Sequence, residues 1–134
     1  MFGRKKSAPI TGKIDTLISK AAQVQGDVEF SGGLHLDGRV TGNVRSLGTE
    51  PATLWISEQG TVEGSVQVPS VVINGTVIGG GHSSDFLELQ TRARVTGDVE
   101  YSTIEIHLGA VIQGRLVHQG AAAKAVELKL AASN

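Results

Sequence analysis

The chain has 134 residues, which is enough for one domain with a single hydrophobic core. A net charge of -1 and only 4% aromatic residues argue against a nucleic-acid-binding protein, which needs a basic surface or stacking platforms. The lack of cysteine excludes disulfides and thiolate metal sites, and no apolar run is long enough for a signal peptide or a membrane span. We therefore expect a cytoplasmic protein with no nucleic-acid partner.

Residues 1–13 are expected to form a flexible tail that can bind an anionic membrane. Two apolar side chains stand beside three cations: Met1, Phe2, Arg4, Lys5 and Lys6. An anionic bilayer contributes about 1 kcal/mol per basic residue, and inserting Phe2 adds about 1.5–3 kcal/mol. The sum corresponds to a dissociation constant for one tail on the order of 0.1–1 mM, and many tails held together would bind better through effective concentration. A tail that only keeps the protein soluble is the alternative.

A Val-x-Gly-x-Val signature recurs six times in the middle of the chain. Its central glycines are Gly26, Gly42, Gly64, Gly79, Gly97 and Gly114. The spacings are 16, 22, 15, 18 and 17 residues, and the longest contains a loop-like insertion, residues 46–51. The fourth copy has Gly81 in place of its second apolar residue, and the sixth is a looser copy. Repeats of this length indicate a solenoid.

Apolar and polar residues alternate around each signature, as in a β-strand with one buried face. The apolar set of the second copy is Leu34, Leu36, Val40 and Val44; that of the third is Leu54, Ile56, Val62 and Val66. Coils of 15–18 residues divide into three short faces, and one coil cannot bury its apolar side alone. The pattern predicts a triangular parallel β-helix of about six coils. We expect each signature glycine on the inward side, where the coil bends without room for a side chain.

Several segments, in this order, resemble the bactofilin family of bacterial cytoskeletal proteins. They are Thr16-Leu-Ile18, Gly26-Asp-Val-Glu-Phe-Ser-Gly-Gly33, Leu36-Asp-Gly-Arg-Val-Thr-Gly-Asn-Val44, Val72-Ile-Asn-Gly-Thr-Val77, Ala93-Arg-Val-Thr-Gly-Asp-Val99 and Gly109-Ala-Val-Ile-Gln-Gly-Arg-Leu116. The resemblance implies a right-handed β-helix over residues 14–118 that polymerises without nucleotide into non-polar filaments. It also implies a scaffold at the inner membrane that localises cell-wall enzymes or other morphogenetic proteins and so affects cell shape or polarity.

The two end coils are the expected polymerisation interface. A solenoid needs a polar cap at each end to remain monomeric, and residues 1–13 make a poor one. The proposed contacts are Val24, Val28 and Phe30 in the first coil and Ile104, Ile106, Leu108, Ile112 and Leu116 in the last, where alternation places these five on the inward side. In bactofilins a Phe of the last coil is important for polymerisation, and Ile112 occupies what resembles its place.

Residues 119–134 are expected to form a flexible C-terminal tail. The stretch from Gly120 to Ala132 is rich in alanine, so a short helix that caps the last coil is the alternative.

No catalytic residue, cofactor or metal site is predicted. A hexapeptide-repeat-like β-helical acyltransferase is one alternative, and a non-polymerising binding module is another. The transferase needs a strict six-residue period and a catalytic histidine in a subunit cleft. The four histidines, His35, His82, His107 and His118, fall on polar positions or loops, where we expect solvent exposure. The run Gly79-Gly80-Gly81 lacks the lysine and the following helix of a phosphate-binding loop.

Overall fold

The computed structural model describes residues 15–48 and 51–119, and within these ranges every regular element is a β-strand. No helix able to cross a membrane was found in this part of the chain. The sixteen strands are β1 (Thr16–Ile18), β2 (Gln23–Gln25), β3 (Val28–Phe30), β4 (Gly32–Leu36), β5 (Arg39–Thr41), β6 (Val44–Ser46), β7 (Ala52–Ile56), β8 (Thr61–Glu63), β9 (Val66–Gln67), β10 (Ser70–Ile73), β11 (Thr76–Ile78), β12 (Gly81–Leu89), β13 (Arg94–Thr96), β14 (Val99–Ile106), β15 (Val111–Gln113) and β16 (Leu116–His118).

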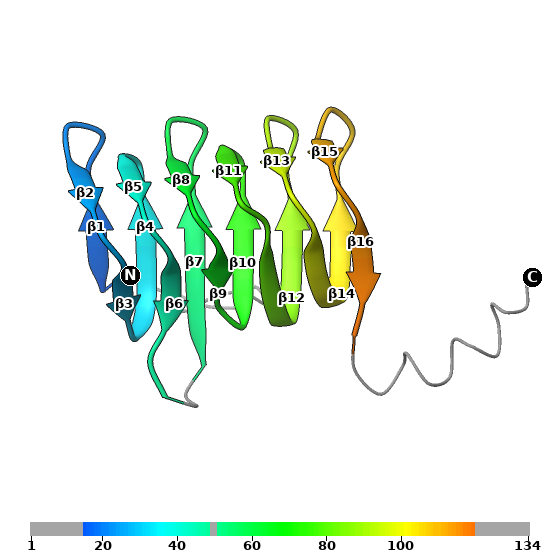
Figure 1. Cartoon of the computed structure of the whole chain (residues 1–134), viewed down its shortest axis with the longest axis horizontal. Helices are drawn as coiled ribbons and strands as arrows, with labels where there is room; N and C mark the ends of the chain where they lie inside the picture. The colour runs from blue at the N-terminus through cyan, green and yellow to red at the C-terminus, as the bar shows by residue number, and fades with distance from the viewer. Residues whose placement is uncertain (1–14, 49–50, 120–134) are drawn as a thin grey trace, which may run out of the picture.

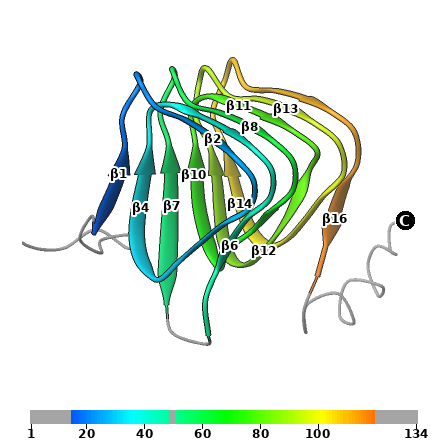
Figure 2. The same cartoon turned by 60° about the vertical axis from the view of Figure 1, so that its left-hand side comes forward.

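The strands stack in parallel on three faces of a solenoid (Figures 1 and 2). The first face contains β1, β4, β7, β10 and the C-terminal parts of β12 and β14. The second contains β2, β5, β8, β11, β13 and β15, one strand from each of six coils. The third contains β3, β6, β9, the N-terminal parts of β12 and β14, and β16. The predicted all-β parallel solenoid of about six coils is confirmed.

Equivalent residues of successive coils form inward rows that fill the core. One row on the second face contains Val24, Val40, Val62, Val77, Val95 and Ile112. One row on the first face contains Ile18, Leu36, Ile56, Ile73, Leu89 and Ile106. The interior members of these two rows are 0–4% exposed, so the apolar alternation predicted the core correctly. Burying each such side chain contributes about 1.5–3 kcal/mol.

The signature glycines form a column at the corner between the second and third faces. A Cβ on Gly64, where φ is +153°, would lie 2.1 Å from the carbonyl oxygen of Gly42 in the preceding coil. The glycine is therefore required by close contact along the solenoid axis, and the missing side chain would point at the neighbouring coil. The expectation that it points into the core is wrong. At Gly26, in the first coil, an added Cβ meets nothing within 4 Å among the described residues.

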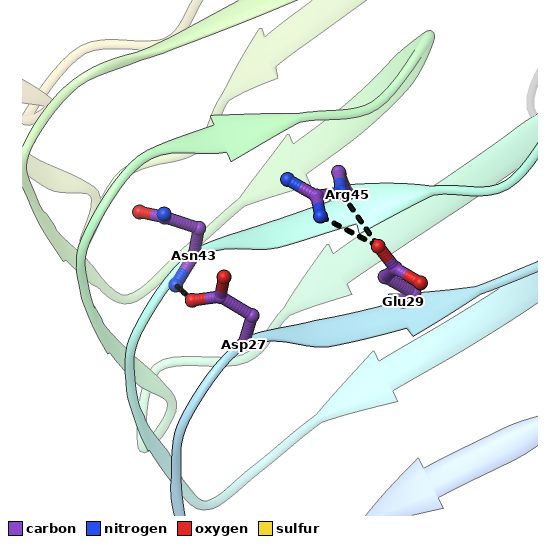
Figure 3. Close-up of polar contacts among 4 residues, drawn as sticks. All are labelled: Asp27, Glu29, Asn43 and Arg45. Carbon is purple, nitrogen blue, oxygen red and sulfur yellow. Dashed lines mark hydrogen bonds and ion pairs between the residues drawn. The ribbon is translucent and has the colours of Figure 1, made fainter.

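The side chains directly after three signature glycines, Asp27, Asn43 and Asp98, accept hydrogen bonds from the backbone of the next coil, and Figure 3 shows the first of these contacts. Asp27 Oδ1 accepts a hydrogen bond from the Asn43 backbone N–H at 2.9 Å, and Asn43 Oδ1 accepts one from the Ser65 N–H at 2.9 Å. On the adjoining strands, Arg45 donates to Glu29 Oε2 through Nε at 2.8 Å and Nη2 at 2.6 Å. These side-chain contacts support the register of the third face in the first three coils.

We expect Gly64→Ala to destabilise the solenoid far more than Gly26→Ala. Both substitutions place alanine at a positive φ, but only the first drives a methyl group into the backbone of a preceding coil. The clash and strain together should lower the free energy of unfolding of Gly64→Ala by at least about 2 kcal/mol. Urea unfolding followed by circular dichroism measures both variants, and equal losses would contradict the axial-contact explanation.

Candidate assembly surfaces

The last coil leaves an apolar layer uncovered at the C-terminal end of the solenoid. Ile106 is 47% exposed, although Leu36 and Leu89 of the same inward row are 0% exposed. Leu116 is 39% exposed, whereas Val44 of its row is 0% exposed. Ile104 and Ile112 are half-buried and pack against the core. We call Ile104, Ile106, Ile112 and Leu116 the C-terminal end surface.

The first coil exposes a smaller apolar layer, which we call the N-terminal end surface. Its members Val24 and Val28 are half-buried and pack against the core, as Ile18 does. Phe30 is only 6% exposed and belongs to the core of its own subunit. Of the three first-coil residues expected at the interface, Val24 and Val28 are thus the more available.

Both end coils also present open strand edges. Within the described ranges, β1, β2 and β3 pair only with the second coil, and β15, β16 and the C-terminal part of β14 pair only with the fifth. Among the described residues, nothing pairs with their outer N–H and C=O groups, which form sheet edges of the kind that can pair with another chain. Within the same ranges, each end therefore combines an open strand edge with core side chains that no further coil covers.

The expectation that Leu108 lies on an inward row is wrong. Leu108 is 93% exposed because the chain turns at residues 107–110, where the Ala110 N–H donates to the His107 carbonyl oxygen. The corresponding turn of the fifth coil, closed by a bond from the Ala93 N–H to the Gln90 carbonyl oxygen, carries Thr91 at this position. Strand alternation ends at Ile106, so Leu108 sits at a corner of the solenoid.

A charged pair holds the last coil to the fifth. The Arg115 backbone N–H donates to Asp98 Oδ1 at 3.0 Å, and its guanidinium donates to Oδ2 at 2.9 Å through Nη2. These hydrogen bonds lower the pKa of Asp98, and the same contact raises the pKa of Arg115. Asp98 occupies the same position after a signature glycine as Asp27 and makes the same kind of contact to the next coil. Arg115 occupies this position in the last coil.

The four histidines lie at separate places and make different contacts. His35 Nε2 is 3.0 Å from Asp37 Oδ1, and His82 Nδ1 is 2.9 Å from Glu100 Oε1. Near His35, a hydrogen bond from Ser57, followed by the imidazole, lowers the pKa of Asp37.

The expected polar position of His118 is wrong. His118 pairs with Tyr101 on an inward row of the third face, and the centroids of the two rings are 5.5 Å apart. Its Nε2 is 2.9 Å from the Ser102 carbonyl oxygen, so the ring is half-buried at the end of β16.

A further cluster was not recognised in the sequence. His107 Nε2 lies 3.1 Å from Glu88 Oε2 and 3.2 Å from Glu105 Oε2. The ligand atoms of these residues lie within 4.8 Å of one another, so the set could hold a divalent cation. Direct contact of the His107 imidazole with the two carboxylates accounts for the arrangement equally well. The coil spacing of 17 residues between Glu88 and Glu105 is the signal that brings them together.

The predicted membrane-binding residues and most of the C-terminal tail lie outside the described residues. These are Met1, Phe2, Arg4, Lys5 and Lys6, together with residues 120–134.

Comparison with known proteins identifies the family. The family model Bactofilin, described as polymer-forming cytoskeletal, matches residues 16–117. Bactofilin BacO of Myxococcus xanthus is 31% identical over 102 residues, covering 76% of this chain and 78% of the relative. Bactofilin BacP of the same organism is 26% identical over 102 residues, covering 76% of this chain and 41% of the relative. No solved structure gave a significant match. Since the family model spans all six coils, the chain belongs to the bactofilin family of polymer-forming cytoskeletal proteins.

Proposed function

We propose that the chain assembles through its end coils into non-polar filaments, without nucleotide, and that these filaments bind the inner face of the membrane. The observation that carries the proposal is the 47% exposure of Ile106 in a row whose interior members are 0–4% exposed. A second subunit docked on this layer would cover Ile106 and remove it from water. Family membership supports the polymer, and the end surfaces supply a route to it.

Like-to-like docking accounts for a non-polar filament. An interface that pairs the same surface of two subunits is isologous. Each end of the solenoid would therefore dock on the same end of another subunit. The alternating use of the two end surfaces then extends the filament indefinitely. This arrangement is implied by the family resemblance, and it makes a specific prediction for variants blocked at one end.

Assembly without nucleotide is consistent with the glycine-rich corner of the fourth coil. The Gly79 N–H donates to the Thr96 carbonyl oxygen, and the Gly81 N–H donates to the Asp98 carbonyl oxygen. Gly81 then opens β12, which is a strand. A phosphate-binding loop needs free N–H groups at the start of a helix, whereas these groups already bind the next coil.

The membrane role rests on the chemistry of Met1, Phe2, Arg4, Lys5 and Lys6. One segment binds an anionic surface weakly, but a filament presents one segment per subunit and gains through effective concentration. Such a polymer could position cell-wall enzymes or other morphogenetic proteins along the cytoplasmic side of the membrane.

Ile106→Asp should abolish filaments, because it places a charge on the C-terminal end surface. If like ends pair, the N-terminal surfaces still dock and the variant forms dimers; a head-to-tail filament would instead leave monomers. Electron microscopy and light scattering distinguish these products.

Ile78→Asp is the matched control, since Ile78 is 46% exposed but lies on the outer side of the fourth coil. Unchanged filaments of Ile106→Asp would contradict the proposal, and discrete wild-type trimers would favour a β-helical transferase.

Gly26→Ala should block the opposite end. The added methyl group points to where a preceding coil would stack, so C-terminal dimers are expected and the double variant with Ile106→Asp should be monomeric. Gly48→Ala controls for strain, because Gly48 has φ +69° and an added Cβ meets nothing within 4 Å. Filaments of Gly26→Ala would show that the N-terminal end does not dock coil to coil.

Phe2→Ala and the pair Lys5→Glu and Lys6→Glu should reduce sedimentation with anionic liposomes without dissolving filaments. Ile106→Asp should also reduce it, because separate subunits lose multivalency. Normal sedimentation of the charge-reversal variant would place the membrane contact elsewhere on the chain.

The Asp98–Arg115 pair should stabilise the last coil where Asp98 is ionised, with the full effect above the ordinary pKa of an aspartate. Because the folded-state pKa of Asp98 is lowered, its stabilisation is present near neutral pH and disappears as the pH falls through that lowered value. In the Ile106→Asp background, Asp98→Asn should lower the melting temperature by a few degrees at most near pH 7. Circular dichroism should show this difference vanish in acid, and a difference independent of pH would exclude the ionic contribution.

A further inference from the structure

The outer side of the first face carries a groove that the fold does not require. Its floor is apolar and contains Trp55, Val72 and Phe86, from three successive coils. Val72 stands opposite Trp55 in the ladder and is only 7% exposed, although it points away from the core. The hollow has a volume of about 590 Å³. We call it the Trp55 groove.

The rim of the Trp55 groove is acidic. Among the described residues, Glu58, Glu88 and Glu105 line it, and no lysine or arginine does. Glu58 is paired with Arg92 at 3.2 Å, and His107 lies near the other two carboxylates. The side chain of Glu105 is still 58% exposed, so it can accept another cation. A complementary ligand therefore combines an apolar ring with positive charge.

The N-terminal segment, residues 1–6, has this chemistry. Phe2 stands beside three consecutive cations, Arg4, Lys5 and Lys6. Phe2 can cover the apolar floor, a cation can lie over the face of the Trp55 indole, and the remaining cations can meet the glutamates.

The segment can also reach the groove. The described residues start at Asp15, directly before β1, and β1 is three strands from β10, which carries Val72, on the same face. Three strand spacings amount to about 14 Å. Residues 7–14 span up to about 26 Å when extended, which is enough to place Phe2 over Val72.

We propose that the N-terminal segment docks in the Trp55 groove of its own chain and that an anionic membrane competes with the groove for the same side chains. This inference rests in part on the proposed membrane role. It makes membrane attachment conditional, because Phe2 and the cations cannot occupy both sites at once. The tether raises the effective concentration of the segment at the groove to the millimolar range, so weak contacts suffice.

Trp55 is the only tryptophan of the chain and reports directly on the groove. In the full-length protein, quenching of its fluorescence by acrylamide should be weak. Phe2→Ala, or Lys5→Glu with Lys6→Glu, should raise the Stern–Volmer constant about twofold if the tether keeps the groove occupied half of the time or more. Lys124→Glu with Lys129→Glu is the matched control, with the same charge change in the other terminal segment. Equal quenching of wild type and the N-terminal variants would overturn the docking.

A charge swap tests the contact without depending on a single variant. Glu105→Lys should raise quenching, and adding Lys5→Glu to Glu105→Lys should restore protection. Failure of the second change to restore it would argue against pairing at this rim. Protection that grows with protein concentration would show that the segment comes from a neighbouring subunit, which would overturn docking within one chain.

Lipid vesicles separate this inference from the membrane proposal. Phosphatidylglycerol vesicles should bind the wild-type protein and raise Trp55 quenching to the level of Phe2→Ala, whereas phosphatidylcholine vesicles should do neither. Binding with unchanged quenching would falsify the competition. If no vesicle binds but the N-terminal variants still expose Trp55, docking stands and the membrane role fails.

Discussion

The close axial contact between successive coils is the constraint on which the rest of the structure depends. Main-chain N–H groups of one coil donate to carbonyl oxygens of the next, and the corner glycines allow the backbones to approach. A methyl group on Gly64 would lie 2.1 Å from the Gly42 oxygen, so a side chain at this corner would force the two coils apart. Inward packing, as in the valine row of the second face, follows once this spacing is set. Coils of unequal length are tolerated because the extra residues lie between strands, at the corners, as in the insertion between β6 and β7.

The same constraint explains why the ends differ from the interior. Each coil satisfies its backbone and covers its core through two neighbours, and an end coil has only one. Ile106 and Leu36 occupy the same row, yet 47% of one and 0% of the other is exposed. In the proposed assembly, a second subunit would cover the end layer that a further coil covers in the interior. Docking would then remove the same kind of apolar side chains from water as folding does.

The sequence pattern correctly predicted the positions that recur in every coil. It misplaced residues of the last coil, where the repeat ends. The valine rows and the number of coils followed from alternation and from the glycine spacing, because both are enforced in every coil. Leu108 was misplaced because a turn ends the alternation after Ile106. Among the described residues no further coil follows, so no equivalent residue shows which side this position faces. His118 was misplaced because its row is set by pairing with Tyr101 across one coil. The approach of Glu88 to Glu105 likewise depends on the exact length of a coil, which composition does not reveal.

The outward positions are the part of the solenoid that folding leaves free, and their chemistry differs between faces. On the second and third faces, outward side chains form ion pairs between coils, such as Arg39 with Glu63 and Arg45 with Glu29. On the first face, Trp55 and Phe86 bring apolar surface to the outside around Val72. Neither the core nor the axial contacts need these side chains there, and water disfavours exposing them. A contact made after folding would account for their position. If the end coils are occupied in an assembly, as proposed above, a groove on the side of the solenoid would stay accessible in every subunit.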